Sequence, residues 1–334
     1  RKELGDGSVQ NQQSLERGQT WMLIDNVAGL PLSVQLGRIA LIERRSWWWD
    51  DDLDAVRLNY SAGKWRLETG LAQELARKSS AESGIDPNTK DVTRWFGNGS
   101  FRWAPRHTLE AFWLINNDSS GAPASGTLFA PDTEDASDAK LRWLGLRAAG
   151  EARYESGHRL GYRADTAWLS GREIRTRFNE MPDGQLSADN SIERNVSGRA
   201  WDIGAYWRLP DVATFSLGLA NGSGGISSDT SDNNFRQTGL QENKGRVTGV
   251  KRLRYYGELI DPQLANLRIA TIGVGLRFLD NSSVELLQHR YRQQVASSQL
   301  SGSRLSEDPE GTNRDIGREI DLFIAMREWR HAEV

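Results

Sequence analysis

The chain has 334 residues and no cysteine, so neither disulfide bonds nor thiolate metal sites can hold its fold. Its formal net charge of −3 argues against the broad basic field that a nucleic-acid-binding protein needs. No apolar run approaches the roughly 18 residues of a membrane helix, which excludes an α-helical membrane protein. The 13 tryptophans and 33 glycines favour β-strands with amphipathic ends.

A period-2 alternation of apolar and charged residues recurs along the chain and predicts about thirteen β-strands. In the fourth of these strands, Trp65, Leu67 and Leu71 alternate with Arg66 and Glu68. We therefore expect strands with one apolar face and one charged face. In chain order the predicted strands cover residues 17–25, 32–43, 53–60, 63–77, 92–103, 107–117, 139–153, 158–171, 196–209, 213–221, 265–278, 282–292 and 315–326.

The connections between these strands alternate between short turns and long polar loops. This alternation is typical of up-and-down membrane barrels, whose periplasmic turns are tight and whose external loops are free to grow. We therefore predict an all-β fold, a transmembrane antiparallel up-and-down β-barrel, with residues 1–334 forming a single outer-membrane domain. The long external loops are predicted near 44–52, 78–91, 118–138, 172–195, 222–264 and 293–315.

A soluble all-β protein is the alternative, and two features of the sequence speak against it. The polar strand faces carry arginine interleaved with Glu and Asp, and few of the lysines that are typical of solvated strands. Tryptophans also recur near the strand ends, where membrane barrels place interfacial girdles of aromatic residues. The predicted girdle residues are Trp47, Trp48, Trp49, Trp95, Trp103, Trp113, Trp143 and Trp207.

An acidic run and the few histidines suggest other chemistry. Asp50, Asp51, Asp52 and Asp54 are clustered carboxylates of the kind that calcium prefers, but they lack the spacing of a known calcium loop. We expect them in an exposed, polar external loop without a metal. None of the four histidines lies in a nucleophile or zinc motif, so we expect neither an enzyme nor a cofactor.

Three segments resemble the alginate export family: VQLGRIALIERRSWWWDDDLDAVRL (34–58), FRQTGLQENKGRVTGVKRLRYYGELIDPQLANLRIATIGVGLRF (235–278) and DIGREIDL (315–322). Weaker matches follow the same order at 143–154 and 166–171. The resemblance implies one barrel of about eighteen strands in the outer membrane of a Gram-negative bacterium. Thirteen strands then indicate a fragment that lacks strands at both ends, because an open sheet cannot persist in lipid.

The resemblance also implies passive export of alginate, a polymer with one carboxylate per sugar, through an electropositive pore. Arginine suits such a pore because it is always charged and contacts carboxylates in a bidentate manner. The expected partners are this anionic polysaccharide, outer-membrane lipid and lipopolysaccharide, and secretion components of the periplasm or inner membrane. We expect a monomer that binds no nucleic acid.

Pore residues of the family are carried over position by position. Arg17, Asp50 and Arg252 match its pattern, and Arg38 follows Gly37 as in the family. The chain differs from the pattern at three positions: Ala40 and Asp261 stand where the family has arginines, and Arg77 stands where it has a glutamate.

Alternation alone adds further candidates for the pore lining. For each of them, a salt bridge that stiffens the barrel wall is the structural alternative. Arg254 belongs with Lys251 and Arg252 to a basic cluster on a long loop, and a solvated loop or a contact with lipopolysaccharide phosphates is the alternative there. The candidates from alternation are Lys64, Arg66, Arg94, Arg147, Arg159, Arg163, Asp165, Asp202, Arg208, Glu319 and Asp321.

Two other functions stay open at this point. A general porin for small anionic solutes would share the fold and differ in pore width. A structural or adhesive barrel would act through its loops and conduct no ions.

Overall fold

The computed structural model describes residues 14–82, 84–86, 89–119, 121–129, 138–182, 184–210, 212–225, 228, 230–305 and 307–328, with two short strands before them. Its elements are β1 (Lys2–Glu3), β2 (Val9–Gln10), β3 (Thr20–Ile24), the 3-10 helix η1 (Val27–Gly29), β4 (Leu32–Ile42), β5 (Asp50–Ala62), β6 (Trp65–Gln73), β7 (Val92–Ala104), β8 (His107–Asp118), β9 (Leu128–Phe129), β10 (Asp138–Arg153), β11 (Arg159–Glu180), β12 (Leu186–Arg208), β13 (Thr214–Gly222), β14 (Ser231–Asp232), β15 (Lys244–Gly245), β16 (Leu253–Arg254), β17 (Leu267–Phe278), β18 (Ser282–Gln293) and β19 (Asp315–Ala325).

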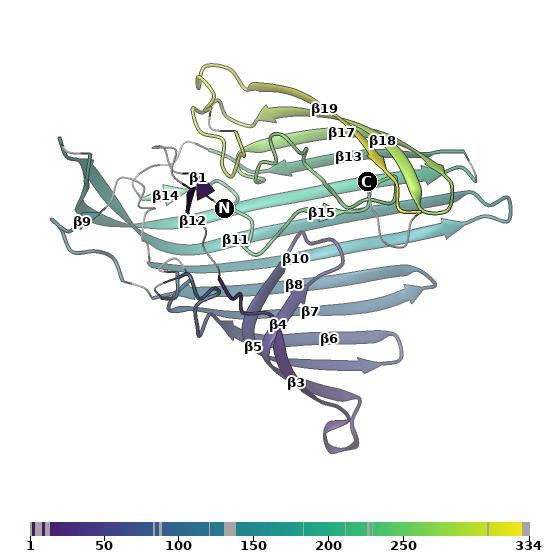
Figure 1. The fold of residues 1–334 in the computed structure, drawn as a ribbon, viewed down its shortest axis with the longest axis horizontal. Helices are drawn as coiled ribbons and strands as arrows, with labels where there is room; N and C mark the ends of the chain where they lie inside the picture. Colours follow the sequence, from purple (N-terminus) through teal and green to yellow (C-terminus); the bar gives the residue numbers. More distant parts are fainter. Residues whose placement is uncertain are drawn as a thin grey trace.

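One large antiparallel sheet dominates the structure. Its strands follow the order β3-β4-β5-β6-β7-β8-β10-β11-β12-β13-β17-β18-β19, so each long strand pairs with the next one along the chain. The sheet is curved, and its edge strands β3 and β19 lie at opposite margins (Figure 1). In the described part of the chain these two strands do not pair with each other. The predicted all-β, antiparallel, up-and-down fold is confirmed, and the sheet is open.

Some strand ends differ from the prediction. β11 continues past residue 171 to Glu180, and β12 begins at Leu186, ten residues before the predicted strand. Most of the range 172–195, predicted as a loop, is therefore a paired hairpin. Ile174, Thr176 and Phe178 alternate with arginines there, and the high polarity of the segment hid this alternation. Within the predicted loops, residues 83, 87–88, 120, 130–137, 183, 226–227, 229 and 306 lie outside the described residues.

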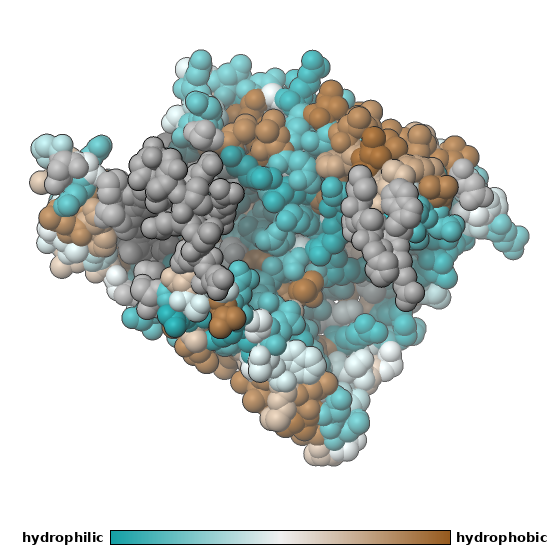
Figure 2. Space-filling view, viewed as in Figure 1, coloured by the Kyte–Doolittle hydropathy of each residue, from teal (hydrophilic) through white to brown (hydrophobic). Residues whose placement is uncertain are grey.

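The two faces of the sheet differ in polarity, as the alternation predicts. On the convex face, Leu71, Leu217 and Leu322 are 58%, 63% and 64% exposed. On the concave face, Arg147 and Asp165 are buried. Figure 2 shows hydrophilic side chains in the central hollow, and hydrophobic ones along the margins formed by β17–β19 and by β3–β6.

The predicted interfacial position is wrong for four of the eight girdle tryptophans. Trp47, Trp48 and Trp49 are at most 2% exposed, and Trp143 is equally buried. The segment 43–49 turns onto the concave face, where the Trp48 ring stacks on Phe112 with centroids 5.0 Å apart. Of the other predicted girdle residues, Trp95, Trp103 and Trp207 are about half exposed and Trp113 is partly buried.

The acidic run also lies elsewhere than predicted. Asp50, Asp51, Asp52 and Asp54 belong to β5 and are partly buried, so the prediction of an exposed external loop is wrong. Asp54 accepts a hydrogen bond from Arg17, and Asp52 accepts one from Gln19. The segment before β3 therefore packs against these carboxylates, which is a long-range contact that local sequence does not reveal.

No helix in the described residues has the length and the apolar composition needed to cross a membrane.

Candidate functional site

A buried ionic network fills the centre of the concave face. Arg45 donates to Asp165 at 2.7 Å and also to Asp202, and Arg147 donates to Glu43 at 2.5 Å and to Asp165 at 2.6 Å. These five side chains are all buried. Buried charges are tolerated when each one has an opposite partner, and here two arginines face three carboxylates.

The segment 43–49 inserts part of this network from between β4 and β5. Burial alone would raise the pKa of Glu43, but the Arg147 guanidinium and backbone N–H donors lower it below its ordinary value. Burial would likewise lower the pKa of Arg45, yet Asp202 and Asp165 raise it well above its ordinary value. Both groups therefore stay charged, and together they hold the segment against β10, β11 and β12.

The long segment 223–266, in the residues that the structure describes (223–225, 228 and 230–266), also packs on the concave face, and two glutamates of the sheet hold it there. Glu285 on β18 accepts hydrogen bonds from the backbone N–H groups of Thr248 and Gly249 at 3.1 and 2.6 Å. Glu319 on β19 accepts from those of Leu259 and Ile260 at 2.6 and 3.1 Å. These bonds satisfy backbone donors that would otherwise be buried without partners.

A cavity of about 890 Å³, open to solvent, lies beside this network on the concave face. Arg106 occupies the turn between β7 and β8 and Arg153 ends β10, so the cavity lies toward the short turns. Its lining is strongly basic. The eight arginines and three glutamates of the lining are Arg44, Arg45, Arg106, Arg147, Arg153, Arg163, Arg246, Arg252, Glu43, Glu110 and Glu151.

Half of these arginines are already neutralised by the protein. Arg45 and Arg147 belong to the buried network, Arg153 pairs with Glu151 at 2.5 Å, and Arg252 pairs with Asp50 at 3.0 Å. By contrast, Arg44, Arg106 and Arg246 are exposed and make no hydrogen bond or ion pair with any residue that the structure describes. The cavity thus presents unpaired guanidinium groups to solvent.

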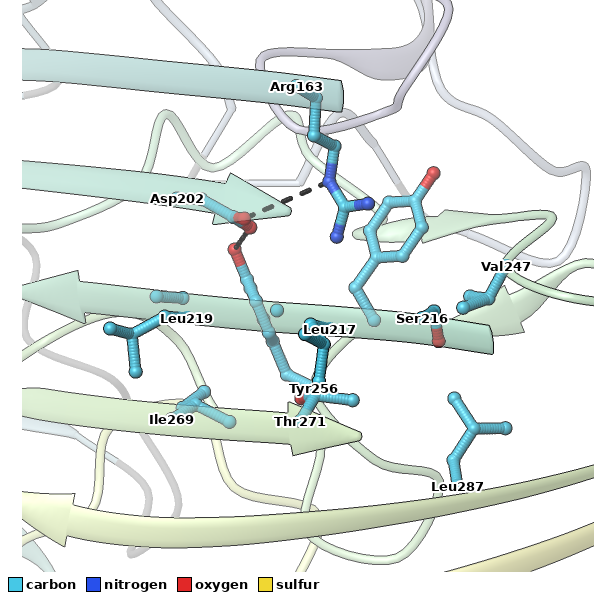
Figure 3. Close-up of a pocket in the computed structure, with 13 residues that line it drawn as sticks. Arg163, Asp202, Ser216, Leu217, Leu219, Val247, Tyr256, Ile269, Thr271 and Leu287 are labelled. Atoms are coloured by element: carbon cyan, nitrogen blue, oxygen red, sulfur yellow. Dashed lines mark hydrogen bonds and ion pairs between the residues drawn. The ribbon is translucent and has the colours of Figure 1, made fainter. Parts of the chain in front are cut away.

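Arg163 is the fourth weakly paired arginine of this cavity. Its nearest acidic atom is Asp202 Oδ1, 3.9 Å from Nε, whereas Asp202 Oδ2 is bonded to Arg45 and to the Tyr256 hydroxyl. Figure 3 shows Tyr256 reaching Asp202 from below while Arg163 approaches from above. Burial and the adjacent Asp202 raise the pKa of Tyr256 well above its ordinary value, so its hydroxyl remains a donor.

The residues assigned through the family pattern are mostly paired with acidic groups. Arg17 pairs with Asp54 at 2.5 Å, and Arg38 is buried and pairs with Glu74 at 2.9 Å. Asp50 accepts hydrogen bonds from Arg252 and Ser46. Neither Arg17, Arg38 nor Asp50 lines the large cavity, whereas Arg252 does.

Arg254 lies on the same long segment and is doubly neutralised. It pairs with Asp261 and lies 3.4 Å from Glu258. Burial raises the pKa of Asp261 to about 6, although Arg254 acts in the opposite direction. The position at which the chain differs from the family pattern therefore supplies the counter-charge of Arg254.

The candidates from alternation fall into three groups. Arg147 and Arg163 line the cavity, with Asp165 and Asp202 behind them. Glu319 fastens the long segment, and Asp321 lies beside it, 3.5 Å from His289 Nε2. The remaining candidates lie outside the large cavity: Lys64 and Arg66 are exposed, Arg94 is buried, Arg159 is partly buried at the start of β11, and Arg208 contacts Thr214.

Sequence reasoning missed several residues of the site. Arg44 and Arg45 belong to a segment predicted as an external loop, Arg106 to a tight turn, and Arg246 and Tyr255 to a loop without alternation. None of them lies on a predicted strand face. A signal was present for Arg44 and Arg45, because a charged pair followed by three tryptophans is unusual for a solvated loop.

Comparison with known proteins gives a consistent result. The family described as alginate export matches residues 10–334. The alginate production protein AlgE of Pseudomonas aeruginosa is 26% identical over 322 residues, which cover 96% of this chain and 65% of that protein. AlgE of Pseudomonas syringae pv. tomato is 22% identical over 87% of this chain and 60% of its own length. AlgE of Azotobacter vinelandii is 25% identical over 86% and 60%. The chain therefore spans about 60–65% of the length of these relatives.

Proposed function

The chain belongs to the alginate export family, and we propose from this premise that the complete protein is a passive outer-membrane channel for an anionic, alginate-like polysaccharide. The observation that carries the proposal is the arginine-lined cavity on the concave face. Arg44, Arg106 and Arg246 offer charge that has no partner among the residues described in the structure. A polyuronate supplies the carboxylates that such groups bind best.

The convex face supports a place in a lipid bilayer. Large apolar side chains stand exposed along successive strands, as Leu144, Ile203 and Ile320 do at 61%, 52% and 62%. A soluble protein would leave such a surface in water at a cost of about 25 cal/mol for each Å² of apolar area. Lipid, with lipopolysaccharide in the outer leaflet, is the environment that removes this cost.

The acidic residues of the cavity fit transport better than tight binding. Glu110 and Glu151 lie among the arginines, and Glu151 also accepts a hydrogen bond from Tyr206 at 2.5 Å. A conduit must release its cargo, and carboxylates near the cations weaken each individual contact with a polyanion. We propose transport without catalysis, with periplasmic or inner-membrane components delivering the polymer to a monomeric barrel.

Single-channel conductance of the full-length protein in a planar bilayer tests this function. An oligo-uronate and a neutral oligosaccharide of equal length are added in turn. We expect concentration-dependent block by the oligo-uronate alone. Equal block by both sugars, or by neither, would replace this function with that of a general porin for small anions, and an absence of conductance would point to a structural barrel.

A further inference from the structure

The convex face of the sheet carries a group of arginines that the proposed channel does not use. Arg268 on β17, Arg290 and Arg292 on β18 and Arg318 on β19 are all exposed. Tyr291, which stands between Arg290 and Arg292, is fully buried on the concave face. Because successive side chains of a strand point to opposite faces, its two neighbours lie on the convex face. These four arginines are called the convex arginine cluster below.

Strand register brings the four arginines side by side. β17, β18 and β19 are neighbours at one margin of the sheet (Figure 1). Arg268 lies directly opposite Arg292, and Arg290 lies directly opposite Arg318. Neighbouring strands are about 4.8 Å apart, and residues two positions apart on one strand are separated by about 7 Å. The two opposed pairs therefore form adjacent rows of one compact cluster.

The convex arginine cluster is unfavourable for the protein on its own, because like charges directly opposite each other destabilise a sheet. The guanidinium groups of Arg268, Arg292 and Arg318 make no hydrogen bond or ion pair with any residue that the structure describes. Arg290 contacts one acid, Asp315, at 3.3 Å. The other described acidic residues shortly before β19 form no ion pair with the cluster: Glu307, Asp308 and Glu310. An anion from outside the chain would offset the repulsion.

The position of the cluster along the strands is informative. Arg268 is the second residue of β17 and Arg292 is the last but one of β18, so the cluster lies at the strand ends that the long segments join. Toward the short turn between β17 and β18 the same face is apolar, with Ile272, Ile320 and Leu322 exposed by 54%, 62% and 64%. Arginines on a lipid-facing wall cost little near the membrane interface and much at its centre. The cluster therefore marks the boundary between acyl chains and headgroups on the side of the long loops.

We propose that the convex arginine cluster binds the phosphates of a lipopolysaccharide molecule, whose acyl chains lie on the apolar strip below it. Arginine suits phosphate because its planar fork donates two hydrogen bonds at once. A ligand for this place needs closely spaced anionic groups joined to acyl chains, and lipopolysaccharide combines them in the outer leaflet. A polyuronate has no acyl chains and does not match this surface. The inference rests on the proposed function only for the location in the outer membrane.

The test measures binding of fluorescently labelled lipopolysaccharide to the full-length protein in micelles of an uncharged detergent. Arg268→Gln with Arg292→Gln removes one opposed pair of charges, and we expect the apparent dissociation constant to rise about fivefold for each arginine lost. Asp315→Asn removes the acid that contacts Arg290 and should lower the dissociation constant. The wild type should bind dephosphorylated lipopolysaccharide about tenfold more weakly than the intact form.

Arg77→Gln with Lys90→Gln is the matched control. Both residues are exposed at the long segment between β6 and β7, so this variant loses the same charge on the side of the long loops, away from the cluster. Its dissociation constant should equal that of the wild type. Circular dichroism checks that each variant keeps its β-structure. If Arg268→Gln with Arg292→Gln does not fold, Arg290→Gln with Arg318→Gln carries the test.

The outcomes separate this site from the channel. Block by oligo-uronate should be the same in Arg268→Gln with Arg292→Gln as in the wild type, because the cluster lies outside the pore. A wild-type channel that oligo-uronate does not block would overturn the proposed function and leave the binding result standing. Equal affinity for intact and dephosphorylated lipopolysaccharide, or equal affinity of the cluster variant and the control variant, would overturn the site. Equal competition by phosphatidylglycerol would also overturn it, since the cluster would then recognise any anionic headgroup.

Discussion

Arg45 donates a hydrogen bond of 2.7 Å to Asp165, a residue 120 positions further along the chain. This contact ties the segment between β4 and β5 to the first half of β11. It also places an arginine, an aspartate and three tryptophans inside the curve of the sheet. The interior is thus organised by pairs of residues that are far apart in sequence.

The Arg45 pairing should contribute strongly to stability. Replacing Arg45 by Met leaves Asp165 without one of its two cations and Asp202 without its closest one. Loss of one partner of a buried pair costs about 3–5 kcal/mol. We expect this loss in urea unfolding of the barrel in lipid vesicles, whereas Arg44→Met, at the exposed neighbouring position, should change the unfolding free energy by less than about 0.5 kcal/mol. Equal free energies of unfolding for Arg45→Met and Arg44→Met would mean that the buried ionic network is not required for stability.

The tryptophan segment should be equally sensitive to truncation. Trp48 stacks on Phe112, and a side chain at Gly145 on β10 would overlap its indole. Trp48→Ala removes these contacts and should cost about 3–5 kcal/mol. The control is Trp207→Ala on the convex face, where 49% exposure predicts a smaller loss. Urea unfolding curves measure the loss of unfolding free energy in both variants. A larger loss for Trp207→Ala than for Trp48→Ala would contradict the buried packing of Trp48 against Phe112.

Ion selectivity should depend on the unpaired arginines more than on the paired ones. Arg44→Glu with Arg246→Glu reverses two charges that have no partner in the described residues, and we expect the anion-to-cation permeability ratio to fall about threefold. Arg252→Glu with Arg254→Glu reverses the same number of charges. Because Arg252 and Arg254 pair with Asp50 and Asp261, the sequence alone would rank these two positions too high.

Reversal potentials in a salt gradient measure both double variants. A larger change for Arg252→Glu with Arg254→Glu would show that pairing does not attenuate the charge of these residues.

The pH dependence of selectivity should report on Asp261. Burial raises its pKa to about 6. As the pH falls through this value, Asp261 takes up a proton and no longer neutralises Arg254, so the local charge becomes more positive. Anion preference should therefore rise as the pH falls through about 6 and decline again as it rises. Reversal potentials from pH 5 to 7.5 should show this step in the wild type, and Asp261→Asn should abolish it; a step of equal size in Asp261→Asn would assign it to another group.

The strands were predictable because their signal is local. Alternation at 63–77 and 158–171 already separates Leu71 and Trp168 from Glu68 and Asp165, and the structure exposes the first pair. Strand ends were less predictable. The β11–β12 hairpin loses its apolar residues as it extends, and Asp50–Asp54 has the composition of a loop although it is paired with β4.

The candidate site was predictable only in part, for the same physical reason. A period of two fixes which strand residues share a face, and this was enough to find Arg147, Arg163, Asp165 and Asp202. It gives no information about segments outside the strands, which bring Arg44, Arg45, Arg246 and Tyr255 to the cavity. Nor does it show which cations have a partner, because Arg252 and Asp50 are 202 residues apart.

The sequence by itself determined the antiparallel all-β architecture, the chain order of its strands and the polarity of its two faces, since each depends on alternation between near neighbours. The tertiary structure decided which aromatic residues are buried and which arginines remain unpaired. Both depend on where the segments 43–49 and 223–266 pack against the sheet. That packing depends on long-range ion pairs, ring contacts and backbone hydrogen bonds between residues far apart in the chain.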